Sequence, residues 1–328
     1  MRAVFFLHSE SNLEALKELN PERDFAHFQT GERAWILQTY LRLKQAGYDV
    51  ALTDRWPERG LLVFSSKQRR ILRRLAGSTE EVYLLGVRED VGQALIADWE
   101  VLQNGRLVDG RARFYVPFWP QPGLIARDAS RGHVLRRAAY KGFLGNLHPD
   151  FRDERWPRFL AERGIEWTCD APQYSGRQRV TATMHWNDYS EVDLIVAIRP
   201  YDRYLHVRKP ATKLYNAWLA GVPAMLGPEY AYRELRRSDE DYIEVGTLSD
   251  AMRGVDLLLQ QPERYAAMIA NGQRRAREFT HMAILHQWAQ LLFETLPART
   301  ADARVRRWRG RSLSARKYFR QLLPFLDR

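Results

Sequence analysis

Apolar and polar residues form alternating blocks along the first part of the chain, some with strand patterns and others with helix patterns. Residues 1–8 are an apolar run that ends at His8. The segment 31–47 has apolar residues at helical spacing and ends at Gly47, which suits a helix C-cap. Because the two patterns continue to alternate, the sequence predicts a parallel, doubly wound sheet. The expected elements are strands over 1–8, 48–53, 61–65 and 81–86, and helices over 31–47 and 68–75.

A second alternating series follows a less regular stretch. In that stretch Asn104-Gly105 predicts a hairpin turn, and three prolines crowd residues 117–122. The series then opens with a strand that runs into a glycine loop over 138–146, and residues 193–198 form a continuous apolar run, as a buried parallel strand requires. Further elements are expected as helices over 151–163, 212–220, 249–259 and 262–279, and as strands over 165–168, 223–226 and 242–245.

These patterns predict two Rossmann-like α/β lobes, each a parallel sheet flanked by helices, and a basic helical tail. The length of 328 residues fits two domains of ~150 residues, and an apolar content of 45% is enough for two cores. We place the lobes at residues 1–130 and 131–295 and the tail at 296–328.

The net charge limits the kinds of binding partner that we expect, and the cysteine content limits the cellular compartment. The net charge of +11 suits polyanions such as nucleotide diphosphates, acidic lipid headgroups or nucleic acid. A single cysteine, Cys169, excludes an internal disulfide and fits a reducing compartment. The opening apolar run is too short for a signal segment and no run is long enough to span a membrane, so we expect a cytoplasmic location.

Two common nucleotide-binding motifs are absent from the sequence. There is no Gly-x-Gly-x-x-Gly after a strand and no Gly-x4-Gly-Lys-Ser/Thr, which disfavours a dinucleotide oxidoreductase and a P-loop enzyme. No His-x3-His pair occurs either, and the spacing of His281 and His286 does not suit metal ligation. We expect no metal ion and no cofactor.

The most informative segment is 208–229. Its predicted helix starts after Pro210, carries Lys213 in the first turn, ends at Gly221 and leads into a buried strand and a second glycine turn. The N–H groups of a helix N-terminus together with Lys209 and Lys213 would bind a diphosphate, and parallel sheets hold ligands at the carboxyl ends of their strands.

The motif Lys213-Leu214…Ala220-Gly221-Val222-Pro223 resembles the donor lobe of GT-B glycosyltransferases of the group 1, or family four, type. The glycine loop 142–146 and the turn Gly31-Glu32-Arg33-Ala34 are similar to the family's pattern too, and the resemblance extends over residues 1–295. It implies sugar transfer from a nucleotide-sugar donor to a glycan, a glycolipid or another hydroxyl acceptor, as in polysaccharide biosynthesis. The substrate-binding residues that it favours are Gly31, Gly145, Asn146, Arg199, Lys209, Lys213, Asn216, Gly227, Pro228 and Glu229.

The chain departs from the family where retaining members carry two glutamates spaced Glu-x7-Glu. Those positions hold Arg208 and Asn216 here. Asn216 could still hydrogen-bond ribose hydroxyls, but an arginine cannot accept a hydrogen bond from a sugar hydroxyl. The stereochemical outcome of the transfer therefore stays open.

An inverting transferase needs a general base, which in this family comes from the first lobe. His8 is our first choice because imidazole titrates near neutral pH, although a capping or hydrogen-bonded histidine is the simpler interpretation. Glu32, at the glycine turn, and Asp54, at the end of a strand, are the alternatives.

The tail combines basic and apolar residues. The segment Arg304–Arg320 contains no acidic residue, and as a helix it would place a cationic face beside an apolar stripe. This pattern fits a peripheral position on an anionic membrane and equally a helix that packs on the first lobe. Two other functions stay open: a non-catalytic nucleotide-sugar or glycan-binding protein of the same fold, and a nucleic-acid-binding protein, which the lack of any recognised nucleic-acid-binding module disfavours.

Overall fold

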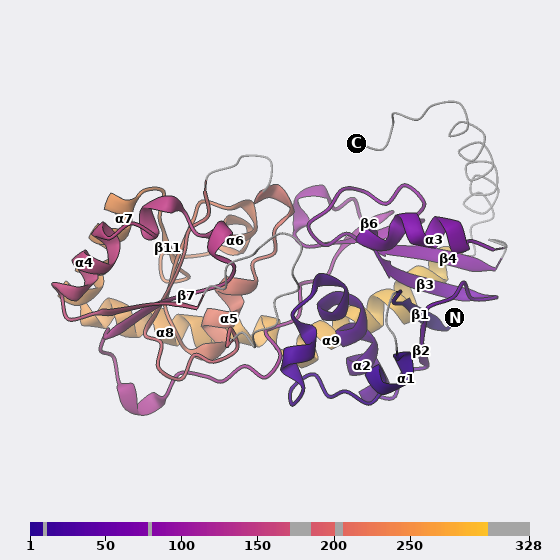
Figure 1. Cartoon of the computed structure of the whole chain (residues 1–328), viewed down its shortest axis with the longest axis horizontal. Coiled ribbons are helices and arrows are strands. Elements are labelled where there is room, and N and C mark those ends of the chain that lie inside the picture. The colour runs from indigo at the N-terminus through magenta and orange to yellow at the C-terminus, as the bar shows by residue number, and fades with distance from the viewer. Residues whose placement is uncertain (9–11, 78–80, 171–184, 201–205, 301–328) are drawn as a thin grey trace.

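The computed structural model describes residues 1–8, 12–77, 81–170, 185–200 and 206–300. Within these segments two parallel sheets lie in two lobes placed side by side, with helices packed against them (Figure 1). The predicted fold class, two α/β lobes with parallel sheets flanked by helices, is confirmed for these segments.

The first lobe holds a six-stranded parallel sheet with the strand order β2-β1-β3-β4-β5-β6. Residues of β1 alternate between two cores, since Phe5 packs in the cluster that contains α2 and Phe6 in the cluster that contains α3. Helices therefore cover both faces of this sheet, which is why its central strands are apolar throughout. The elements are β1 (Ala3–Phe6), α1 (Leu13–Leu16), α2 (Gln38–Gln45), β2 (Val50–Thr53), β3 (Gly60–Ser65), α3 (Arg69–Leu75), β4 (Val82–Val87), β5 (Trp99–Leu102) and β6 (Arg113–Tyr115).

The predicted hairpin at Asn104-Gly105 is wrong. Strands β5 and β6 pair in parallel, so the chain between them makes a crossover rather than a two-residue turn. The Asn104 side chain accepts a hydrogen bond from the Arg106 N–H at 3.2 Å. Its Nδ2 donates to the carbonyls of Val207 (2.9 Å) and Lys209 (3.2 Å) in the second lobe. Asn104 is thus a contact between the lobes.

The second lobe holds a five-stranded parallel sheet with the order β11-β10-β9-β7-β8. Its central strand β9 is buried along its whole length, as the apolar run predicts. Gly221 ends α5 with a φ of 70°, a left-handed conformation that glycine adopts without strain. The elements are β7 (Arg137–Lys141), α4 (Arg155–Ala161), β8 (Glu166–Asp170), β9 (Leu194–Ala197), α5 (Thr212–Ala220), β10 (Ala224–Leu226), α6 (Tyr230–Leu235), β11 (Ile243–Glu244), α7 (Leu248–Gln260) and α8 (Pro262–Ala276).

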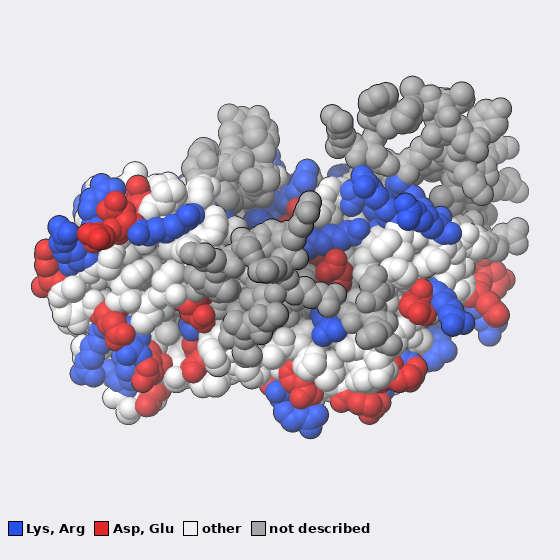
Figure 2. Space-filling view, viewed as in Figure 1, with Lys and Arg blue, Asp and Glu red and all other residues white. Residues whose placement is uncertain are grey.

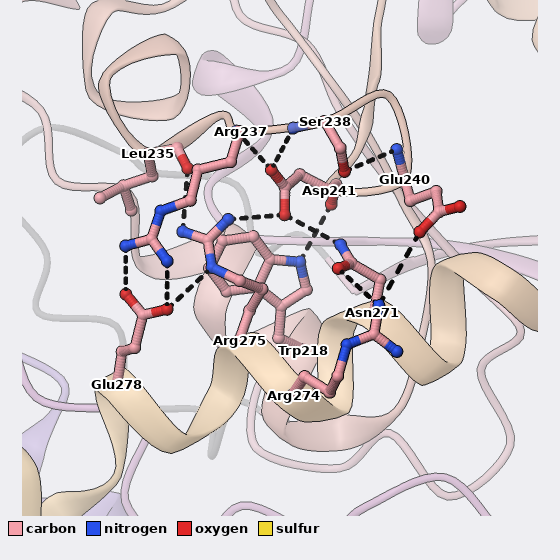
Figure 3. A network of polar contacts seen from close by, with 10 residues as sticks. All are labelled: Trp218, Leu235, Arg237, Ser238, Glu240, Asp241, Asn271, Arg274, Arg275 and Glu278. Atoms are coloured by element: carbon pink, nitrogen blue, oxygen red, sulfur yellow. Dashed lines mark hydrogen bonds and ion pairs between the residues drawn. The ribbon is translucent and has the colours of Figure 1, made fainter.

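A buried polar network fixes α5 against α8 (Figure 3). The Asp241 carboxylate accepts hydrogen bonds from Arg275 Nη1 at 2.7 Å and Asn271 Nδ2 at 2.9 Å, both on α8. The Asp241 carbonyl accepts from the indole N–H of Trp218 on α5 at 2.9 Å, and the Arg275 guanidinium lies 4.6 Å from the Trp218 ring centroid. These buried groups satisfy one another and hold α5 against α8.

The end of the described chain returns to the first lobe. Helix α9 (His281–Ala289) leaves α8 and packs beside the first sheet (Figure 1), where Ile284, Trp288 and Leu292 join the core cluster of β1 and α2. Helix α10 (Leu296–Thr300) follows, and Leu296 lies in the same core. This differs from the predicted boundary, which assigned residues up to 295 to the second lobe. Helical spacing shows that the segment has an apolar face but not which sheet covers it.

No helix within the described segments has the length and apolar character needed to cross a bilayer. The tail segment Arg304–Arg320, on which the predicted membrane contact depends, lies outside the described residues.

Candidate functional site

Arg199 and Glu229 form a buried ion pair at the carboxyl ends of two neighbouring strands. Arg199 follows β9 and Glu229 follows β10, and since these strands pair in parallel, their ends bring the two side chains together. Arg199 Nη1 donates to Glu229 Oε2, and the side chains are 14% and 4% exposed. In the described part of the chain, Arg199 Nε and Glu229 Oε1 have no hydrogen-bond partner. Each residue therefore keeps an atom that a ligand could use.

Lys213 brings a second cation to this site from the first turn of α5. Its ammonium donates to the Lys141 carbonyl at the end of β7 and lies 5.0 Å from the ring centroid of Tyr140. Burial, and next the charge of Arg199, lowers the pKa of Lys213 to about 7. Among the described residues no carboxylate forms an ion pair with Lys213. A bound anion would supply the missing countercharge.

Two glycine segments border these cations. A Cβ on Gly142 would lie 2.8 Å from Lys213 Nζ, so the loop after β7 approaches the ammonium closely. The same loop contains Gly145, which is exposed, and Asn146, and it is tied to the end of β9 by a hydrogen bond from the His148 N–H to the Ile198 carbonyl at 2.8 Å.

The second glycine segment is the turn that follows β10. A Cβ on Gly227 would lie 3.8 Å from the backbone nitrogen of Arg199. Pro228 comes next and Glu229, which pairs with Arg199, ends the turn. The structure thus brings Arg199, Lys213, the 142–146 loop and Gly227–Glu229 to one edge of the second sheet.

Asn216 and Lys209 are engaged in contacts away from this cluster. The Asn216 oxygen accepts a hydrogen bond from the Gln121 N–H at 3.0 Å, which anchors the link between the lobes to α5. Lys209 Nζ lies 3.0 Å from Asp90 Oδ2 in the first lobe. To contact a diphosphate at the second lobe, the Lys209 ammonium would have to leave this carboxylate. Both residues connect the lobes in the structure described here.

The first lobe presents its own polar cluster at the carboxyl ends of β3 and β4. Glu89, two residues after β4, accepts a hydrogen bond from the Ser65 hydroxyl at the end of β3. Lys67 Nζ lies 2.7 Å from Glu89 Oε2 and 3.4 Å from Asp90 Oδ1. Gly31 is next to this pair, since a Cβ there would be 2.4 Å from Glu89 Oε2. The charge of Glu32 acts on both Lys67 and Glu89.

His8 and Asp54, the other candidate bases, lie at the ends of β1 and β2. The His8 ring stacks on Phe6 with 6.2 Å between centroids. Asp54 is exposed, and its carboxylate is 3.7 Å from the neighbouring Arg55. In the described residues no three His, Cys, Asp or Glu side chains are grouped as a metal ion would require.

Sequence patterns did not identify Lys141, Lys67, Glu89 and Asp90. Lys141 is the last residue of β7, and the other three follow a strand within three residues. The rule that ligands bind at the carboxyl ends of parallel strands could have identified them. No local pattern, however, distinguishes Glu89 from the other charged residues that follow strands in this chain.

Solved structures match the chain in fold, whereas comparisons with protein-family models and with curated sequences find no match. The HepE protein of Anabaena, in complex with UDP and glucose, is 12% identical; the match covers 89% of this chain and 99% of HepE with a TM-score of 0.54. Sucrose-phosphate synthase from Thermosynechococcus elongatus is 11% identical over 90% of this chain and 99% of the synthase, also with a TM-score of 0.54. HepE in complex with UDP-glucose gives 13% identity and a TM-score of 0.52.

At such identities the likeness concerns the arrangement of the chain. The match extends over nearly the whole of each solved structure, so both lobes and their order are shared. Two parallel sheets, the return of α9 to the first lobe and these matches together show that the chain has the two-lobe GT-B fold.

Proposed function

We propose that the protein is a glycosyltransferase that moves a sugar from a nucleotide-sugar donor, bound by the second lobe, to a hydroxyl group of an acceptor held by the first lobe. The observation that carries this proposal is the placement of Lys213, a partly buried lysine without a carboxylate partner among the described residues, beside Arg199 at the carboxyl edge of the second sheet.

The charge balance of the site favours a diphosphate. The cluster holds three cations, Lys213, Lys141 and Arg199, against two carboxylates, Glu229 and Asp170, so one positive charge is left over. A desolvated ammonium without a carboxylate is costly, and a phosphate oxygen within reach would remove that cost. The solved structures of HepE with UDP and with UDP-glucose have the same fold, which supports a nucleotide sugar as the ligand.

The proposed chemistry needs charge stabilisation at the leaving group. As the bond between the sugar and the diphosphate breaks, negative charge grows on the phosphate oxygen, and preorganised cations stabilise that charge in the transition state. We assign this role to Lys213 and Arg199, and we propose that the reaction needs no metal ion. Glycans and glycolipids are the acceptor classes that we favour.

A thermal-shift panel tests donor binding, because a ligand that binds only the folded state raises the melting temperature. We expect one class among UDP-, GDP- and CMP-sugars to raise the melting temperature of the wild type, and Lys213→Met to abolish that rise. The matched control is Lys44→Met, which replaces a lysine on α2 whose side chain is 43% exposed. The donor site is refuted if no nucleotide sugar raises the melting temperature, or if the rise survives in Lys213→Met.

Release of the nucleoside diphosphate separates the enzyme from a binding protein of the same fold. A transferase releases nucleoside diphosphate from the bound donor, slowly into water and faster with an acceptor present. Binding without release, over the whole panel of donors and with glycan acceptors added, would identify a non-catalytic nucleotide-sugar-binding protein instead.

We also propose a cytoplasmic location with peripheral attachment to an anionic membrane. Basic side chains gather over α3 on the face shown in Figure 2, where the helix carries Arg69, Arg70, Arg73 and Arg74. Such a surface, with the basic tail, suits anionic headgroups. Co-sedimentation with phosphatidylserine vesicles but not with phosphatidylcholine vesicles is expected. Binding that is equally salt-sensitive with DNA or RNA would favour nucleic acid instead.

A further inference from the structure

Glu89 has an unusual backbone conformation at the carboxyl end of β4. Its φ is 51°, and it is the one residue other than glycine with a positive φ that is found in the described part of the chain. This conformation is uncommon for residues with a side chain and costs free energy, so it persists only where surrounding structure holds it. Such strain is concentrated at functional sites, which makes Glu89 a candidate before its contacts are considered.

The Glu89 carboxylate is held in place by Ser65 and Lys67 and packs closely against Gly31. The Glu89 side chain is 2% exposed. Its Oε1 accepts a hydrogen bond from the Ser65 hydroxyl, and Lys67 Nζ lies 2.7 Å from its Oε2. Gly31 has no Cβ, and one would lie 2.4 Å from Oε2. The Glu89 carboxylate therefore packs directly against the Gly31 backbone, and any side chain at position 31 would displace it.

Further polar atoms around this sheet edge lack partners. Ser66 Oγ and Gln68 Oε1, which follow β3, and Gln103 Oε1, which follows β5, are buried without a hydrogen-bond partner among the described residues. Strands β3 and β5 flank β4 in the sheet, so these atoms belong to the same edge as Glu89. Buried polar groups are normally satisfied, and a ligand with several hydroxyl groups would satisfy them.

This edge touches the donor-binding segment of the other lobe. Asp90, next to Glu89, forms the ion pair with Lys209, and Asn104 binds the Val207 and Lys209 carbonyls. Lys209 lies three residues before α5, which carries Lys213. Glu89 is therefore on the side of the first lobe that faces the proposed donor site.

We propose that Glu89 is the general base of the transfer and that the polar edge around it binds the acceptor, an inference that rests on the proposed function. Glu89 Oε2 takes the proton of the acceptor hydroxyl while the acceptor oxygen forms a bond to the anomeric carbon of the donor. The bond from that carbon to the phosphate oxygen breaks, and its electron pair leaves with the nucleoside diphosphate beside Lys213 and Arg199.

The electrostatics of Glu89 agree with this role. Burial raises the pKa of the Glu89 carboxyl, against the opposing effect of Lys67, while Glu32 raises it further. The Lys67 ammonium forms ion pairs with both the Glu89 and the Asp90 carboxylates, since it also lies 3.4 Å from Asp90 Oδ1. A carboxylate with a raised pKa is a stronger base, and the ideal base titrates near the working pH. By contrast, Asp54 is exposed, and its carboxylate faces the adjacent Arg55.

The test measures nucleoside diphosphate release into water from the nucleotide sugar that gives the largest melting shift with the wild type. We expect Glu89→Gln to keep that melting shift and to lower release by about 100-fold or more, the range typical of a lost general base. Glu100→Gln, which changes another buried carboxylate in the same lobe, is the matched control and should keep release within about 3-fold of the wild type.

Azide rescue separates a base from a merely structural residue. The azide ion has no proton to lose, so Glu89→Ala with azide should recover nucleoside diphosphate release and form a glycosyl azide. The wild-type rate should fall at low pH as Glu89 is protonated, and this decline should be absent from the rescued variant. Unchanged release in Glu89→Gln, or failed rescue in a folded Glu89→Ala that still binds donor, would overturn Glu89 alone. A wild type that binds no nucleotide sugar would overturn the proposed function and this inference with it.

Discussion

Replacing Lys213 with methionine should make the protein more stable and unable to bind its donor. The change removes the ammonium but keeps an unbranched side chain of similar length, so packing beside Tyr140 is retained. The gain in stability and the loss of donor binding have the same cause, which is the removal of the Lys213 ammonium. The folded protein holds a desolvated ammonium that Glu229 and Asp170 compensate only in part, and an anionic ligand would complete the compensation.

The magnitude follows from the pKa of Lys213, which falls from 10.5 to about 7. Because the folded pKa is lowered, the unfolded chain binds more protons between these two values, and the stability of the wild type rises with pH across that window. One pKa unit corresponds to ~1.4 kcal/mol, so charging Lys213 costs roughly 4 kcal/mol at pH 7. The hydrogen bond to the Lys141 carbonyl and the contact with the Tyr140 ring return about 1–2 kcal/mol.

Lys213→Met should therefore stabilise the fold by about 2–3 kcal/mol at pH 7, a rise in melting temperature of about 5 °C. Differential scanning fluorimetry measures this without and with nucleotide sugar, and Lys44→Met is again the control. The expected pattern is a higher melting temperature without ligand and no further rise with it. A lower melting temperature together with a full ligand-induced rise would refute both the electrostatic argument and the site.

Three further outcomes are expected. The affinity for nucleoside diphosphate should fall as pH rises above about 7, because Lys213 then loses its proton. Calorimetry in buffers of different ionisation enthalpy should show that the protein takes up a proton when the nucleoside diphosphate binds. An affinity that does not change with pH would contradict this expectation. Glu229→Gln should destabilise the protein by roughly 3–5 kcal/mol, because it leaves Arg199 buried without a carboxylate, and a change below ~1 kcal/mol in urea unfolding would show the pair to be dispensable. Gly31→Ala should displace the Glu89 side chain and lower nucleoside diphosphate release while the melting shift with donor stays intact; unchanged release would mean that the reaction does not depend on the position of the Glu89 carboxylate against Gly31.

Local patterns in the sequence were enough for many of the elements and for much of the proposed donor site. Strand β9 is a continuous apolar run, and α5 has a proline before it and a glycine after it, so period and end signals located both. Arg199, Lys213 and Glu229 follow or begin such elements, and parallel strands bring their carboxyl ends to one edge. For these residues, a place at the end of a strand or the start of a helix is enough to predict the sheet edge at which they lie.

Only the tertiary structure decided the contacts between elements that are distant in sequence. No element is predicted over residues 281–296, and their sequence does not reveal that their apolar side chains join the core of the first lobe. Asn104-Gly105 has the composition of a hairpin turn, yet β5 and β6 are parallel because the wider sheet imposes its own direction.

Glu89 shows the same limit at the candidate site. Its φ, its burial and its contacts with Ser65, Lys67 and Gly31 depend on three segments that converge at one sheet edge. Taken by itself, the sequence determined two parallel α/β lobes and a cationic donor segment, because helix and strand periods are local properties. Which carboxylate faces that segment was decided by packing between segments far apart in the chain, which no local pattern encodes.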